Sequence, residues 1–116
     1  MSDKPLFWLG SSRSDLKTFP LDARRVSGFE LRRVQQGLEP NDWKPMPTVG
    51  PGAQEIRIHT GLEHRIFYVA KFADGVYVLH TFEKRTRRTP KREVELARER
   101  FRALVMKRRT ENPTER

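Results

Sequence analysis

Three consecutive segments with the pattern of β-strands constrain the fold of this chain more than any other feature. EIRIHT (55–60) alternates apolar and polar residues, so its isoleucines share one face and its charged residues the other. HRIFYVAKF (64–72) is apolar on both faces, as a central strand requires, and VYVLHTFEK (76–84) follows an Ala-Asp-Gly turn. Because short turns join antiparallel neighbours, these segments predict a three-stranded meander with 64–72 at its centre.

The residues before the meander predict one further strand and two helices. PLFWL (5–9) is apolar and aromatic and ends at a glycine, which predicts a short strand. Serines that suit a helix N-cap precede a short helix predicted over 15–19, and a proline opens a longer one over 20–36. Approximately helical spacing predicts that the buried side of the longer helix carries Ala23, Val26, Leu31 and Val34.

The connector and the C-terminal part complete the predicted order of elements. Residues 38–53 contain four prolines and two glycines, which excludes a helix interior or a central strand. Thr89-Pro90 supplies an N-cap and a first-turn proline for a helix that should end near residue 107. Its predicted apolar stripe is Val94, Ala97, Phe101, Leu104 and Val105.

Together these elements predict a small α+β domain with its helices on one face of the sheet. We expect a curved, mainly antiparallel sheet of about four strands, two N-terminal helices and a C-terminal helix. A chain of 116 residues is long enough for one domain with one modest core. We assign the domain to residues 1–107 and expect residues 108–116 to form a flexible basic and polar tail.

The net charge of the chain is concentrated near its C-terminus. Residues 84–109 contain twelve Lys or Arg and three Glu, a balance of +9 that equals the net charge of the whole chain. Such asymmetry favours a polyanionic partner, which can be nucleic acid, an acidic protein or a membrane surface. A solvated basic helix face is the alternative.

Other features of the sequence exclude several classes of protein. No apolar run approaches the roughly 20 residues of a membrane span, and the N-terminus lacks the pattern of a signal peptide. The chain has no cysteine, which removes disulfides and thiolate chemistry. We therefore expect a cytoplasmic protein without membrane contact.

Strand alternation places basic and aromatic side chains on the face of the meander away from the isoleucines. If the sheet curls, these groups can converge on one cleft that binds a phosphate. Histidine or a lysine of lowered pKa can move protons there, and an aromatic ring can stack on an unpaired base. Such a cleft suits metal-free RNA cleavage by attack of the ribose 2′-hydroxyl. The candidates for this chemistry are Arg57, His59, Arg65, His80 and Lys84, with Tyr68 and Phe82 for stacking.

Each candidate also has an ordinary structural explanation. Arg57 can pair with Glu55 or Glu63 at the surface, and the aromatic residues can belong to the core. His59 and His64 flank a turn and fit solvated histidines better than metal ligands, because a zinc site needs further ligands. Because these ligands are missing, we predict no metal. A glycine-rich phosphate loop is also missing, so we predict no cofactor.

The stretch from Glu55 to Arg100 resembles the RelE/ParE superfamily of toxins from toxin–antitoxin systems. Within it, the chain is similar to the phage-related HigB-like branch through Glu-Ile-Arg (55–57), Arg-Ile-Phe-Tyr (65–68) and Leu-His-Thr-Phe-Glu-Lys-Arg-Thr (79–86) followed by Thr-Pro (89–90). The resemblance implies a RelE-like fold and, in many members, cleavage of messenger RNA in the ribosomal A site.

The resemblance also implies roles for individual residues. Arg57 and Arg65 would hold or polarise the phosphate, and Lys84 would lie near the scissile bond. The residues expected to contact RNA are Tyr68, Phe82, Arg85, Arg87, Arg88 and Lys91, and His59 and His80 are candidates for proton transfer. Many members have Lys-Lys where this chain has Lys84-Arg85; an arginine cannot give up its proton, which makes Lys84 the better candidate.

The resemblance further implies a partner. This would be a helix-turn-helix antitoxin, encoded beside the toxin, that neutralises it in a hetero-oligomer. Two other functions remain open at this point: a ParE-like inhibitor of DNA gyrase, and a basic module that binds ribosomal RNA without catalysis.

Overall fold

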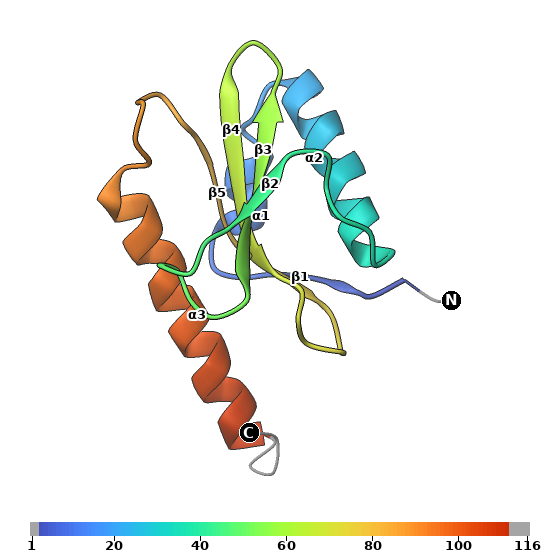
Figure 1. Cartoon of the computed structure of the whole chain (residues 1–116), viewed down its shortest axis with the longest axis vertical. Helices are drawn as coiled ribbons and strands as arrows, with labels where there is room; N and C mark the ends of the chain where they lie inside the picture. Colours follow the sequence, from blue (N-terminus) through green and yellow to red (C-terminus); the bar gives the residue numbers. More distant parts are fainter. Residues whose placement is uncertain (1–2, 112–116) are drawn as a thin grey trace.

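The structure is a computed structural model that describes residues 3–111 as an α+β domain with three helices and a five-stranded mixed sheet (Figure 1). The elements in chain order are β1 (Leu6–Trp8), α1 (Ser12–Leu16), α2 (Leu21–Gln35), β2 (Trp43–Pro45), β3 (Ala53–His59), β4 (Glu63–Val69), β5 (Val76–Glu83) and α3 (Lys91–Glu111). The predicted fold class is confirmed.

The sheet contains the predicted meander and two added edge strands. Its order is β1-β5-β4-β3-β2, with antiparallel β3–β4 and β4–β5 pairs and β4 at the centre. β1 pairs with β5 in parallel. β2 lies in the connector that the sequence assigned to irregular structure, and it makes the sheet one strand larger than predicted. A short strand is compatible with Pro45 there because β2 is at the edge.

Helices cover both faces of the sheet, so the prediction of helices on one face is wrong. Phe19, Leu31 and other residues of α2 and the α1–α2 segment pack on one face, against Ile66 and Tyr68 of β4. α3 packs on the other face, against Phe67 and other residues of the central strands. In Figure 1, α2 and α3 lie on opposite sides of the strands. The physical reason is β4 itself: a strand that is apolar on both faces needs a cover on each.

The orientation of α2 also differs in part from the prediction. Ala23, Leu31 and Val34 are buried as predicted, but Val26 is exposed. Glu30 is buried instead, because its carboxylate accepts hydrogen bonds from the backbone and side-chain nitrogens of Asn41 at 2.6 and 2.8 Å. These bonds fasten α2 to the connector.

The helices begin and end at other residues than predicted. α1 covers Ser12–Leu16 rather than 15–19, and Ser12 is buried because its Oγ donates to the carbonyl of Val78. α3 continues to Glu111, so the first part of the predicted tail is helical; residues 112–116 lie outside the described part. Arg108 pairs with Asp74 at 3.0 Å and lies over the ring of Phe72, which holds this last turn against the body.

A β-bulge in β5 determines where α3 attaches. Phe67 is opposite His80, whereas its neighbour Tyr68 is opposite Val78, so Leu79 is the extra residue. His80 Nε2 lies 2.8 Å from a carboxylate oxygen of Glu93 on α3. Arg100, also on α3, donates to the carbonyl of Leu79 at 2.9 Å. These contacts fix the helix across the end of the sheet.

Candidate anion-binding cleft

The register of the central strands aligns the predicted site residues in one row. Arg57 on β3 is directly opposite Arg65 on β4, and Arg65 is directly opposite Phe82 on β5. Since residues paired across strands project to the same face, these side chains share the face that α3 partly covers. In the next strand, Lys44 of β2 is opposite Glu55 of β3, which lies on the same face as Arg57.

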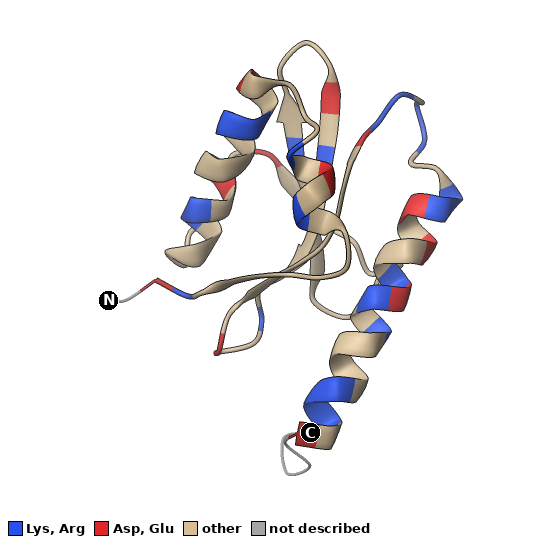
Figure 2. Cartoon of the chain, turned by 180° about the vertical axis from the view of Figure 1, so that it is seen from behind, with Lys and Arg blue, Asp and Glu red and all other residues tan. Residues whose placement is uncertain are grey.

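A cleft of about 310 Å³ opens at this end of the sheet, and basic residues dominate its lining. Its residues are Lys44, Glu55, Arg57, Arg65, Lys84, Arg87, Arg88 and Thr89. The convergence predicted for Arg57, Arg65 and Lys84 is therefore present. In Figure 2 the loop between β5 and α3, which forms one wall, is coloured largely blue for Lys and Arg. Six cations face one carboxylate, which makes the cleft suitable for a phosphate or another compact anion.

Glu55 lies at the base of this cleft with 1% of its surface exposed. Its Oε1 accepts a hydrogen bond from Arg57 Nε at 3.1 Å, and Arg65 Nε and Lys44 Nζ each lie 3.9 Å from the carboxylate. The carboxylate thus holds three cations together. From the sequence, Glu55 is expected only as a surface partner of Arg57. Its place two residues before Arg57 is the available signal, because alternation puts both side chains on one face.

Arg65 and Lys84 are also held by further hydrogen bonds. Arg65 is buried, and its Nη1 donates to Glu63 at 2.9 Å and to the carbonyl of His64 at 3.0 Å. Lys84 Nζ donates to the carbonyl of Arg87 at 2.7 Å, which folds the loop after β5 back over the strand end. The ammonium group and the guanidinium groups are therefore positioned before any ligand is bound.

His59, the last residue of β3, does not line the cleft. Its Nε2 is 2.6 Å from Asp42 and its Nδ1 is 2.8 Å from Glu63. Hydrogen bonds to these two carboxylates raise the pKa of His59, and the bond with His59 lowers the pKa of Glu63. The imidazole is thus stabilised in its charged form, with both nitrogens engaged. Glu63 Oε1 also accepts a hydrogen bond from Arg65 Nη1, so His59 is linked to Arg65 through this carboxylate without lining the cleft itself.

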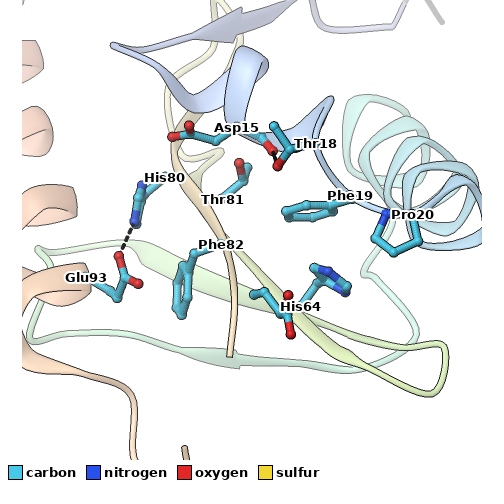
Figure 3. Close-up of a pocket in the computed structure, with 10 residues that line it drawn as sticks. Asp15, Thr18, Phe19, Pro20, His64, His80, Thr81, Phe82 and Glu93 are labelled. Atoms are coloured by element: carbon cyan, nitrogen blue, oxygen red, sulfur yellow. Dashed lines mark hydrogen bonds and ion pairs between the residues drawn. The ribbon is translucent and has the colours of Figure 1, made fainter. Parts of the chain in front are cut away.

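His80 and Phe82 line a second pocket, together with residues of the α1–α2 segment and Glu93 of α3 (Figure 3). Both are buried, and their rings stack at 5.2 Å between centroids. Phe82 also contacts Phe67 edge to face. Figure 3 shows His80 directed at Glu93, with which it is hydrogen-bonded. In this arrangement both rings serve to attach α3, and neither lines the cleft.

The remaining predicted contacts are also separated from the cleft, except for Arg87 and Arg88, which line it. Tyr68 is buried on the opposite face of the sheet, under α2, and burial raises the pKa of its hydroxyl. Its ring is not accessible for base stacking. Arg85 is exposed and paired with Glu83 at 3.2 Å, and Lys91 is exposed in the first turn of α3, paired with Glu95.

His64 was expected at the surface, and that prediction is wrong. Its ring is buried against Phe19, with 4.1 Å between the ring centroids. Burial lowers the pKa of His64, and among residues 3–111 its Nδ1 has no hydrogen-bond partner. The position was ambiguous in sequence because a histidine beside a turn resembles a solvated residue.

The fold and the cleft define a small α+β protein with a cleft lined mainly by Lys and Arg at one end of its sheet. The family described as phage derived protein Gp49-like matches residues 14–102, and the chain belongs to this family, which is part of the RelE/ParE-like toxin superfamily. A comparison with curated proteins found no match. Within residues 3–111, no helix combines the length and apolarity needed to cross a bilayer.

Proposed function

We propose that this protein is the toxin of a toxin–antitoxin pair, of the HigB-like branch, and that it cleaves messenger RNA on the ribosome without a metal ion. Through this it would inhibit translation and growth in the bacterial cytoplasm. The observation that carries the proposal is the convergence of Arg57, Arg65 and Lys84 on one cleft. Fixed cations are what a metal-free phosphoryl reaction needs, because charge accumulates on the phosphate in the transition state.

In the proposed reaction the ribose 2′-oxygen attacks the adjacent phosphorus and the bond to the 5′-oxygen breaks, which leaves a 2′,3′-cyclic phosphate. Arg57 and Arg65 bind the non-bridging oxygens. Lys84 donates a proton to the leaving oxygen. Among residues 3–111, Glu55 is the only carboxylate that lines the cleft, so we assign it as acceptor of the 2′-hydroxyl proton once Arg57 pairs with the phosphate.

The proposed partner is an antitoxin encoded beside this gene. The net charge of +9 attracts an acidic partner in general, and neutralisation by a partner would explain how a host tolerates the toxin. The complex would be a hetero-oligomer. Its recognition by a helix-turn-helix protein rests on the family resemblance alone.

The decisive experiment is induced expression in bacteria followed by mapping of transcript 5′ ends. We expect growth arrest with new ends inside translated messages, in frame with codons. Lys84→Ala should abolish both effects, whereas the adjacent Arg85→Ala, whose side chain lies outside the cleft, should retain them. Intact messages with induced DNA-damage signalling would instead indicate a ParE-like gyrase inhibitor and overturn the proposal.

A further inference from the structure

A second hollow, of about 430 Å³, lies between α2, the end of the connector before β2, and β3. We call it the α2 groove; its lining residues are Arg25, Val26, Phe29, Glu30, Asn41, Asp42, Arg57 and His59. Its middle is apolar because Val26 and Phe29 project outward from α2. Phe29 is 58% exposed, so its ring contributes little to the core of the domain. Exposed apolar patches with a polar rim mark sites of protein association.

The charged residues at the rim of the groove differ in whether they already have a partner of opposite charge. Glu30 is already bonded to Asn41, and Asp42 to His59. Arg25, in contrast, has no ion pair within residues 3–111. Arg57 uses only its Nε, toward Glu55, which leaves its terminal nitrogens available. The unmatched charges are therefore positive, and the complementary ligand is apolar with carboxylates beside it.

These features favour a protein over RNA as the ligand. An RNA strand would place its phosphates near Asp42, whose negative charge repels them. A stacked base needs one aromatic ring, whereas the groove presents both Val26 and Phe29. Apolar side chains of a protein segment can fill the space beside Val26 and Phe29, while its acidic residues reach Arg25 and Arg57.

Arg57 lines both the α2 groove and the anion-binding cleft. A carboxylate that pairs with Arg57 from the groove would withdraw this guanidinium from a phosphate in the cleft. We infer that the α2 groove is the docking site of an inhibitory partner protein, which inserts apolar side chains against Val26 and Phe29 and binds Arg57 with an acidic residue. The choice of partner and the inhibitory consequence rest on the proposed toxin–antitoxin function, whereas the composition of the groove does not depend on it.

The test uses the purified full-length chain and the protein encoded by the adjacent open reading frame, with affinity measured by isothermal titration calorimetry. The groove variant is Phe29→Ser combined with Arg25→Glu. The matched control is Met106→Ser combined with Arg102→Glu on α3, because Met106 is 61% exposed and both residues lie outside the groove. Circular dichroism establishes that each variant is folded.

We expect the groove variant to weaken binding by about tenfold or more, as loss of an interface anchor does, and the α3 control to leave it unchanged. Lys84→Ala, which alters the cleft but not the groove, should bind the partner normally. Equal affinity of the groove variant and the α3 control would overturn the inference, as would the absence of any complex. Toxicity is measured separately, on the chain expressed without the partner. A failure of the proposed nuclease function is therefore distinguished from a failure of the proposed docking.

Discussion

Arg57 and Arg65 lie directly opposite each other on β3 and β4, two like charges in one cross-strand pair. Such a pair is unfavourable in a sheet unless other charges compensate it. Glu55 contacts Arg57 at 3.1 Å and approaches Arg65 at 3.9 Å, and Glu63 binds Arg65 at 2.9 Å. Glu55 and Glu63 offset the repulsion between Arg57 and Arg65, so the sheet can hold both positive charges side by side.

Replacing Glu55 with Gln should destabilise the fold. The change keeps the shape of the side chain but removes the negative charge between Arg57 and Arg65, and breaking a buried ion pair costs about 3–5 kcal/mol. Urea unfolding measures the loss. Adding Arg57→Gln should recover part of it, because one of the opposed charges is then gone; a purely additive double variant would contradict this coupling.

Arg57→Lys should retain the fold and lose most of the proposed activity. Lysine keeps the charge but cannot present two parallel donors to a phosphate. Loss of one transition-state donor lowers turnover by about a hundredfold. Growth inhibition and message cleavage are the measurements, with Arg85→Lys as the control outside the cleft. Wild-type activity of Arg57→Lys would show that a point charge suffices at this position.

The histidines should titrate in opposite directions. Hydrogen bonds to Asp42 and Glu63 raise the pKa of His59 above its ordinary value of 6.5, whereas burial lowers that of His64. NMR titration of the imidazole protons measures both values. An order in which His64 titrates at the higher pH would contradict the structure.

The raised pKa of His59 also predicts a pH-dependent contribution to stability. A raised folded-state pKa means that the contribution is fully present below pH 6.5 and is lost as the pH rises through the folded-state value. His59→Asn should therefore reduce the free energy of unfolding more at pH 6 than at pH 9. Thermal unfolding at the two pH values tests this, and an equal loss at both would exclude a charged His59.

Gly28→Ala should stabilise the protein, whereas Gly10→Ala should destabilise it. Gly28 lies inside α2, and a methyl group there would meet no atom within 4 Å, so the gain is about 0.5–1 kcal/mol. Gly10 has a φ of +53°, and its methyl group would come within 2.5 Å of Arg100 Nε. Thermal unfolding of both variants measures the contrast. A lower melting temperature of Gly28→Ala would contradict the open space around Gly28 on α2.

Local sequence patterns predicted the meander because they depend on neighbouring residues alone. Alternation along 55–60 fixed Arg57 on the face away from the isoleucines, and the pairing of neighbouring strands then brought Arg65 and Lys84 to the same end of the sheet. The apolar stripe that includes Ala97, Phe101 and Leu104 likewise predicted the buried side of α3, and these three are buried. For such elements, periodicity and a short connection determine the outcome.

The errors concern contacts between residues distant in the chain. The Leu79 bulge interrupts the alternation of β5 before His80, and no local pattern shows that His80 pairs with Glu93 of α3. The residues around Tyr68 do not indicate that α2 covers its ring. The hydrogen bond between His59 and Asp42 joins β3 to the connector, and it too is not predictable from neighbouring residues.

The sequence by itself determined the order of the elements other than β2, the central strand, and the convergence of Arg57, Arg65 and Lys84, because these follow from side-chain periodicity over short distances. Only the tertiary structure decided that helices cover both faces, that Glu55 is buried among cations, and that Arg57 is shared by the cleft and the α2 groove. These relationships join segments far apart in the chain, and their formation depends on packing and charge compensation that no local pattern records.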